Sequence, residues 1–361
     1  MDYTVKNRDE LIAICKDKKI KGYSGKTKDA LIKLIDKATN ATTVDNQLLK
    51  MIDLFAGTGA FTYAFENTGK VECVFANDMV DESKKIYDAN FNHKLTFGDM
   101  NDIKVADIPK HDILTGGFSC QPFSIAGKQE GFKDKRSNVF WKILEIIDYH
   151  KPACVILENV KNLLSHDNNK TFEIIKKNLM ERDYHIRYKV LNTAKITGIP
   201  HHRERIYIVC IKSQQLFDKF TLDFDEKPKS QITSLLEPEP NIADKYYYTD
   251  KSSTWELLQN NVVKKNTVYQ YRRVYVRENK SNECPTLTAN MGTGGHNVPI
   301  ILDDKGIRKL TPRECFNFQG FPSSYILPNM ADCNLYKLAG NAVSVPVVQL
   351  IAKRLVALLV E

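Results

Sequence analysis

The fold class follows from one stretch, Leu49-Lys50-Met51-Ile52-Asp53-Leu54-Phe55, which continues as Ala56-Gly57-Thr58-Gly59-Ala60-Phe61. Its apolar first half is typical of a strand, its glycines permit a tight turn, and a helical pattern then runs to Asn67. A second apolar run, Val71 to Ala76, and a helix from about Asp81 to Phe91 follow it. This order predicts the βαβ start of an α/β protein with a doubly wound, Rossmann-like sheet.

The glycine turn and the end of the second strand together predict a nucleoside site. Backbone N–H groups at such a turn approach a ligand closely, and Asp78 follows about 20 residues later, where a carboxylate binds ribose hydroxyls. Thr62 occupies the position at which the dinucleotide fingerprint requires its third glycine. We therefore expect a nucleoside ligand other than NAD.

A third short strand near Leu95 to Phe97 runs into Gly98-Asp99-Met100. Asp99 thus stands at another carboxyl end of a strand, where its side chain can accept a hydrogen bond from the amino group of an adenine ring. The alternative is an ordinary turn or helix-cap aspartate, because aspartate is common in both places.

The fourth strand, which includes Asp112 to Leu114, leads into Gly116-Gly117-Phe118-Ser119-Cys120-Gln121-Pro122-Phe123-Ser124. A thiol at the end of a strand, between glycines and a proline, is presented to a ligand in the way that a nucleophile is. The alternative is a packed core cysteine. The basic, polar loop from Ser124 to Ser137 favours a lid over a charged substrate, and a helix from about Asn138 to Tyr149 follows.

Two further strand ends carry charged side chains. Glu158 follows the apolar run Ala153 to Leu157, and burial there raises a carboxyl pKa enough for proton donation; the alternative is an acid at a helix N-terminus. Arg203 and Arg205 precede the strand Ile206 to Ile211 at a spacing that points both the same way, toward a phosphate or a substrate carbonyl. The adjacent His201 and His202 have no third metal ligand nearby, so we expect no metal.

The first fifty residues form a separate pattern. Asp9 to Lys16 and Lys28 to Ile35 show helical spacing and are separated by a basic loop, which resembles the helix, extended loop, helix modules of the SAP type that contact DNA. The alternative is a small solvated helical pair. Thr42 to Gln47 is expected to be the linker.

Composition sets the class of protein. The chain has 361 residues, 42% of them hydrophobic, and a net charge of +8, which fits a polyanionic partner but also suits a protein that simply stays soluble. Its eight cysteines include no CxxC pair and no zinc-type spacing, which indicates reduced thiols in a cytoplasmic protein. The N-terminus is polar and no apolar run approaches the ~20 residues of a membrane span, so we expect neither secretion nor membrane insertion.

The order of the motifs along the chain resembles that of the DNA (cytosine-5) methyltransferases. The resemblance covers residues 50 to 361 and rests on DLFAGTGAF at 53, GDM at 98, GGFSCQPFS at 116, ENV at 158, RERIYIV at 203, RECFNFQGFP at 313 and GNAVSVPV at 340. The Asn/Asp-Pro-Pro-aromatic motif of the amino-methyltransferases is absent, which separates carbon methylation from nitrogen methylation.

The resemblance implies a mechanism. The Cys120 thiolate adds to carbon 6 of a flipped-out cytosine, and Glu158 hydrogen-bonds nitrogen 3 and the exocyclic amine. Arg203 and Arg205 support the anionic states, and the methyl group passes from S-adenosylmethionine to carbon 5. By the same resemblance the cofactor site comprises Phe55, Ala56, Gly57, Thr58, Gly59, Phe61, Asp78, Met79, Asp99, Met100, Gly117, Ser119, Val139, Asn341, Ala342 and Val343.

DNA contacts are expected in two places, the loop after Cys120 and the Tyr-rich and Gly-rich region before Leu310. Arginine pairs with guanine and glycine allows close approach, although arginine to phosphate is an equal alternative. The residues are Gln121, Ser124, Lys128, Arg136, Arg272, Arg273, Arg277, Thr288, Gly294 and Gly295. The chain departs from the family pattern at Ser119, usually proline, at Asp78, usually glutamate, and at His201, the first position of the QRRER-like motif.

The predicted organisation has three parts: a helical module at 1–45, a catalytic domain at 49–213 and 326–361, and a smaller target-recognition domain at 214–325. The apolar segment Ser344 to Val360 is expected to be a helix that returns to pack on the catalytic domain.

The leading hypothesis is a sequence-specific DNA cytosine-5 methyltransferase of a restriction-modification system. We expect a cytoplasmic monomer of bacterial or viral (phage) origin, and the sequence leaves open whether it acts beside a nuclease of the same specificity or serves a viral or solitary role. The alternatives are a tRNA cytosine-5 methyltransferase and a non-catalytic DNA-binding regulator.

Overall fold

The computed structural model describes residues 6–17, 20, 22–42, 48–118, 139–293 and 298–361. The chain divides into two compact units, Met1–Leu48 and Leu49–Glu361. The first contains α1 (Arg8–Asp17) and α2 (Lys28–Thr42), which confirms the two predicted helices. Apolar side chains one helical turn apart meet between them and form a small core of Leu11, Cys15, Leu31 and Ile35.

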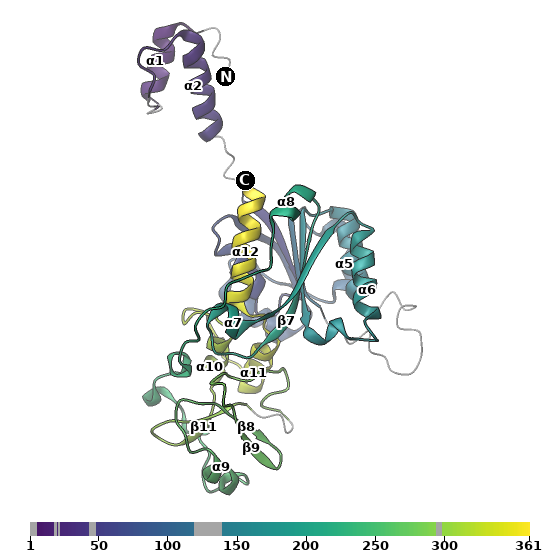
Figure 1. The fold of residues 1–361 in the computed structure, drawn as a ribbon, viewed down its shortest axis with the longest axis vertical. Coiled ribbons are helices and arrows are strands. Elements are labelled where there is room, and N and C mark those ends of the chain that lie inside the picture. The colour runs from purple at the N-terminus through teal and green to yellow at the C-terminus, as the bar shows by residue number, and fades with distance from the viewer. Residues whose placement is uncertain (1–5, 18–19, 21, 43–47, 119–138, 294–297) are drawn as a thin grey trace. The chain divides into compact units, whose positions relative to one another are not determined.

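The second unit is built on a seven-stranded sheet of order β3-β2-β1-β4-β5-β7-β6 (Figure 1). β7 is antiparallel to both neighbours, and the other pairs are parallel. This confirms the predicted α/β class, whereas the reversed direction of β7 was not predicted, since hydrophobic periodicity carries no direction. The strands are β1 (Leu49–Leu54), β2 (Val71–Asp78), β3 (Thr96–Phe97), β4 (Ile113–Gly117), β5 (Cys154–Val160), β6 (His185–Asn192) and β7 (Glu204–Ile211).

Helices cover both faces of this sheet because alternate strand residues point to opposite sides. On one face, Ile52, Leu114 and Val155 pack under α5 (Val139–His150) and α6 (Lys170–Met180). On the other face, Met51, Ile113 and Ile156 belong to one large apolar cluster. That cluster also includes or packs against side chains of α3 (Ala60–Glu66), α4 (Asp81–Asn90), α7 (Thr193–Thr197), α8 (Gln214–Lys219), α10 (Pro312–Phe318), α11 (Asp332–Asn341) and α12 (Val345–Val360).

The C-terminal helix α12 packs on α3, which confirms the predicted return to the catalytic core (Figure 1). The stretch Asp332–Val360 meets the length and composition of a membrane span, the one helical stretch to do so in the described part of the chain. It comprises two helices, α11 (Asp332–Asn341) and α12 (Val345–Val360), the second of which matches the predicted helix, and 44% of its most apolar window is buried inside the protein. The buried α12 residues are Val345, Val347, Val348, Ile351, Ala352, Leu355 and Val356.

A second sheet of order β11-β10-β8-β9 follows in the chain and has a small core of its own. Tyr269, Ile300 and Ile307 from the sheet pack there against Leu258 and Val262 at α9 (Trp255–Asn261). All described pairs in this sheet are antiparallel. The strands are β8 (Tyr269–Arg272), β9 (Tyr275–Glu278), β10 (Ile300–Leu302) and β11 (Ile307–Lys309).

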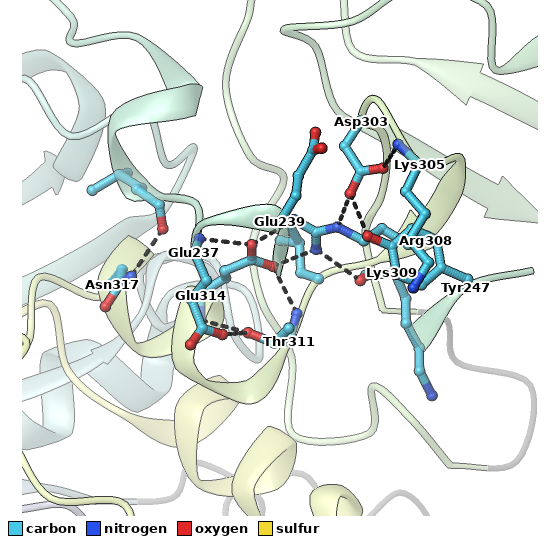
Figure 2. A network of polar contacts seen from close by, with 12 residues as sticks. Glu237, Glu239, Tyr247, Asp303, Lys305, Arg308, Lys309, Thr311, Glu314 and Asn317 are labelled. Atoms are coloured by element: carbon cyan, nitrogen blue, oxygen red, sulfur yellow. Dashed lines mark hydrogen bonds and ion pairs between the residues drawn. The ribbon is translucent and has the colours of Figure 1, made fainter. Parts of the chain in front are cut away.

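A buried ion pair ties β11 to α10 (Figure 2). The Arg308 guanidinium donates two hydrogen bonds to the Glu314 carboxylate, at 2.8 and 2.7 Å, and a third to Asp303 at 2.5 Å. Glu314 also completes a capping box with Thr311 at the start of α10 and accepts the Glu237 N–H at 3.0 Å. We call Arg308 with its acceptors Glu314 and Asp303 the Arg308 hub, and both carboxylates in it accept hydrogen bonds. The hub therefore holds the small sheet firmly to the segment that leads back to the catalytic core.

Candidate active site

A cavity of about 600 Å³ opens at the carboxyl ends of β1, β2, β4 and β5. It brings together residues from segments far apart in sequence, as expected at this edge of an open α/β sheet. Those predicted as cofactor contacts that line it are Phe55, Ala56, Gly57, Thr58, Phe61, Asp78, Met79, Asp99, Met100, Gly117, Val139, Asn341, Ala342 and Val343. Gly59, the last residue of the turn before α3, does not line the cavity, and Ser119 lies outside the described residues.

The turn after β1 has the backbone that the glycines predicted. Gly57 and Gly59 have φ of 55° and 68°, and Phe55 also has a positive φ of 56°. A Cβ at Gly59 would lie 2.3 Å from the Phe91 ring and 2.9 Å from Tyr87, so only glycine fits there without displacing α4. The turn therefore needs glycine for its conformation and for close packing.

Asp78 is fixed at the end of β2 by backbone donors. Its carboxylate accepts the N–H of Gly57 at 2.9 Å and the N–H of Val80 at 2.8 Å. Burial raises the pKa of this carboxyl, and these hydrogen bonds work in the opposite direction by favouring the charged form. An acceptor held in this way beside a glycine turn suits the hydroxyls of a ribose.

Asp99 makes the contacts of a helix-cap aspartate, which is the alternative to a ligand contact. Its side chain accepts the N–H of Asn101 at 2.9 Å and caps the short 3₁₀ turn Met100–Asp102. It also lines the cavity, so capping and ligand contact are compatible at this position.

The lining of this cavity suits a nucleoside. Its exposed wall is more apolar than polar and includes Phe55, Phe61, Met79 and Val343, while Asp78 supplies an acceptor. Tyr325 supports the turn from behind, because its hydroxyl donates to the Thr58 carbonyl at 2.6 Å. A cavity of this size, with apolar walls and polar groups at fixed positions, fits a nucleoside-sized cofactor.

Glu158 and Arg205 form the charged centre of the same cavity. Glu158 lies within β5 rather than at a helix N-terminus, and the antiparallel register with β7 places Arg205 opposite Val160. Arg205 Nε lies 3.2 Å from Glu158 Oε1, an ion pair without the angle of a hydrogen bond, and Oε1 has no hydrogen-bond partner. Burial raises the Glu158 pKa, while the positive charges of Arg205 and Arg203 act against the increase.

Arg203 is placed differently from Arg205. It is 2% exposed, and its NH1 donates to the carbonyls of Leu287 and Gly340, both at 3.3 Å. Burial lowers its pKa to about 10, and repulsion from Arg205 adds to the decrease. Arg203 thus lines the cavity while it also connects segments from three parts of the chain.

Asn159 is a site residue that was not predicted from the amino-acid sequence. Its side-chain N–H donates to the Phe118 carbonyl at 2.7 Å, which fixes the exit of β4 immediately before the segment that contains Cys120. Its position inside the ENV motif was the available signal. Cys120 itself lies outside the described residues, as do Gln121, Ser124, Lys128 and Arg136.

A second cavity of about 680 Å³ lies beside the β8–β9 hairpin. It brings together Arg272, Arg273, Arg277 and Thr288, all of which the sequence suggested as DNA contacts. Gly294 and Gly295 lie outside the described residues. Gln270, which accepts a hydrogen bond from Arg272 at 3.2 Å, and His202 also line this cavity and were not predicted as contacts.

A smaller groove of about 230 Å³ joins the two cavities. It shares Val160 and Arg205 with the first cavity and His202 and Thr286 with the second. A continuous surface therefore runs from the nucleoside cavity past Glu158 to the arginine-lined cavity.

The chain is similar to known proteins over most of its length. The family described as C-5 cytosine-specific DNA methylase matches residues 49–357. The chain is 47% identical over 310 residues to the type II methyltransferase M.Bsp6I of Bacillus sp. (strain RFL6), covering 85% of this chain and 98% of that protein. It is 36% identical over 324 residues to M.HhaI of Haemophilus parahaemolyticus, covering 85% and 95%.

Solved structures share the fold. A DNMT2 protein of Spodoptera frugiperda superimposes with a TM-score of 0.68 at 21% identity, covering 85% of this chain and 99% of that one. A methyltransferase of Entamoeba histolytica gives a TM-score of 0.67 at 20% identity, covering 85% and 98%. The sequence match over most of its length shows that the chain belongs to the C-5 cytosine-specific DNA methylase family.

Proposed function

We propose that the protein methylates carbon 5 of one cytosine within a specific sequence of duplex DNA. The observation that carries this proposal is the placement of the Glu158–Arg205 pair in the wall of a nucleoside-sized cavity that continues into an arginine-lined one. A charged pair at the junction suits a target base brought between cofactor and recognition region. The names of the type II relatives further support a role in restriction-modification.

The proposed cofactor is S-adenosylmethionine, whose sulfonium supplies an electrophilic methyl group. Asp78 binds the ribose hydroxyls, and Phe55, Met79 and Val343 cover the apolar faces of the nucleoside. The shorter Asp78, in place of the usual glutamate, still reaches the cavity because the Gly57 and Val80 amides hold it at its rim. No metal is needed for any of these contacts.

The proposed chemistry begins with Cys120. Its thiolate adds to carbon 6 of the flipped-out cytosine, so that electron density moves to carbon 5. Carbon 5 would then take the methyl group from the sulfonium of S-adenosylmethionine, which leaves S-adenosylhomocysteine. Loss of the carbon 5 proton to a base, such as water, and elimination of the thiolate then restore the aromatic ring and the free cysteine. Asn159 holds the strand exit that leads to Cys120 through the Phe118 carbonyl.

Glu158 and Arg205 act on the target ring. Burial raises the pKa of Glu158 and so favours the protonated carboxyl, which can share its proton with nitrogen 3 as negative charge develops there. Arg205 is 3.2 Å from the same carboxylate and stabilises its ionised form once the proton has moved. Burial thus favours the protonated Glu158 before the proton moves, and Arg205 favours the ionised Glu158 afterwards.

The arginine-lined cavity is proposed to recognise the DNA sequence. Arg272, Arg273 and Arg277 line it and can contact guanine edges or phosphates. The loop 119–138 is proposed to close over the flipped base. The N-terminal unit is proposed as an auxiliary DNA contact, and the protein as a cytoplasmic monomer that acts beside a nuclease of the same specificity.

The test is methyl transfer from labelled S-adenosylmethionine to a randomised duplex pool and, in parallel, to bulk tRNA. We expect 5-methylcytosine in the duplex at one motif. Transfer to tRNA alone would establish the RNA-directed alternative, and cofactor binding without transfer to either would establish the non-catalytic one.

A further inference from the structure

The motif at 201–205 meets a second segment that lines the arginine-rich cavity, residues 284–288, which we call the reading segment. The two run side by side in a short parallel bridge between His201 and Cys284. The His202 N–H donates to the Cys284 carbonyl at 2.8 Å, and the Cys284 N–H donates to the Pro200 carbonyl at 2.6 Å. Thr286 Oγ1 donates to the His202 carbonyl at 2.5 Å. The reading segment is therefore fastened to the motif along its length.

Leu287 is held at both of its backbone groups. Its N–H donates to His201 Nε2 at 3.3 Å, and its carbonyl accepts from Arg203 NH1 at 3.3 Å. His201 Nδ1 lies 3.0 Å from the Phe318 carbonyl, which can only accept, so Nδ1 carries the proton and Nε2 is the acceptor. His201 is fully buried, which lowers its pKa well below the ordinary value and keeps the ring neutral in this tautomer.

Arg203 extends this contact to the cofactor cavity. The NH1 group that holds Leu287 also donates to the Gly340 carbonyl at 3.3 Å, one residue before the cavity-lining Asn341. A Cβ at Gly340 would lie 2.2 Å from the Thr288 carbonyl carbon, so the reading segment lies directly on that glycine. One guanidinium therefore contacts the reading segment and the cofactor segment, while its own residue lines the cavity with Glu158.

We propose that His201 and Arg203 are positioning residues that fix the reading segment against the target-base cavity and so couple recognition of the DNA sequence to methyl transfer. This rests on the proposed function and deepens it. Arg203 acts through Leu287 and Gly340 rather than on the cytosine, whereas Arg205 faces Glu158 directly. A shift of the reading segment by one ångström misplaces the DNA relative to the cavity, which costs turnover without weakening the cofactor site.

The test uses the full-length protein, a randomised duplex pool and bisulfite sequencing of the methylated products. His201→Leu keeps similar volume and removes both hydrogen bonds, and His201→Gln keeps one donor and one acceptor. We expect His201→Leu to lower kcat about tenfold or more on the preferred duplex and to broaden the methylated motif. We expect His201→Gln to remain within about threefold of the wild type, with S-adenosylmethionine affinity within about twofold for both.

His111→Leu is the matched control, because His111 is a second buried histidine whose contact is to the Pro109 carbonyl near the start of β4. It should alter thermal stability and leave the methylated motif unchanged. If His201→Leu does not fold, Thr286→Val removes one hydrogen bond of the same contact and is measured instead.

Hydrogen exchange of residues 284–288 separates this proposal from the proposed function. Faster exchange there in His201→Leu, but not in His111→Leu, supports the coupling even if the wild type transfers no methyl group, an outcome that would contradict the proposed function alone. Unchanged exchange together with an unchanged motif and turnover in folded His201→Leu would overturn the coupling.

Discussion

Arg205 Nε and Glu158 Oε1 lie 3.2 Å apart on neighbouring antiparallel strands, in the wall of the larger α/β domain's nucleoside cavity. Glu158 is buried and the Arg205 side chain is 15% exposed, yet Glu158 Oε1 has no hydrogen-bond partner. A buried carboxylate oxygen left without a donor is costly unless a ligand supplies one, and the amino group of a cytosine is a donor of that kind.

Glu158→Gln should lower kcat for methyl transfer by about 10²-fold or more, because an amide can neither hold a shared proton nor accept from two ring donors. Affinity for S-adenosylmethionine should change little, since Asp78 and the glycine turn form that part of the cavity. Single-turnover transfer and calorimetric cofactor titration give the two values. A turnover equal to that of the wild type would remove Glu158 from the chemistry.

Gly59→Ala should destabilise the protein more than Gly69→Ala. Both glycines have a φ of 68°, but the new methyl group meets Phe91 and Tyr87 only at position 59 and finds open space at position 69. The left-handed backbone alone costs about 1–2 kcal/mol, and overpacking adds about 1–3 kcal/mol at Gly59. Urea unfolding measures the difference, and equal losses would show that α4 moves freely to accommodate the methyl group.

Stability should fall as the pH decreases from about 6.5 toward 4 because of His111. Burial lowers the pKa of its ring to about 4, whereas the unfolded chain takes up the proton near its ordinary value. The unfolded state therefore binds more protons in this window, and the free energy of unfolding decreases by up to about 3 kcal/mol. His111→Leu should flatten this slope in unfolding curves at pH 4, 5, 6 and 7. A slope as steep as that of the wild type would assign the effect to other groups.

Glu314→Ala should destabilise the small sheet and its attachment by about 3–5 kcal/mol, because it leaves the buried Arg308 charge without its bidentate partner (Figure 2). Lys305→Ala, which removes an exposed ion pair to Asp244, is the comparison and should leave the unfolding midpoint nearly unchanged. Similar effects of the two substitutions would mean that the Arg308 hub adds little.

The sequence predicted best what depends on local pattern. Apolar runs located β1, β2 and β5, and side chains at the carboxyl ends of those strands, including Asp78 and Glu158, meet in one cavity because parallel strands end at the same edge. The predicted arginines at 272, 273 and 277 likewise share a cavity.

Contacts across long sequence separations could not be predicted in the same way. Arg203 and Leu287 are 84 residues apart, and nothing in either local pattern indicates their hydrogen bond. The reversed direction of β7 has the same origin, since strand direction depends on the path of the chain rather than on side-chain alternation. For Asp99, the cap contact and the cavity lining occur together, so the two readings of the sequence were not exclusive.

The most direct test of the central claim is bisulfite sequencing of DNA from cells that express the protein, with Cys120→Ser and Glu158→Gln as matched variants. The proposed function predicts 5-methylcytosine at one defined position of one short motif with the wild type, and none with Cys120→Ser. Folded, cofactor-binding wild-type protein that leaves no 5-methylcytosine in the DNA, or a Cys120→Ser variant that methylates as well as the wild type, would contradict it.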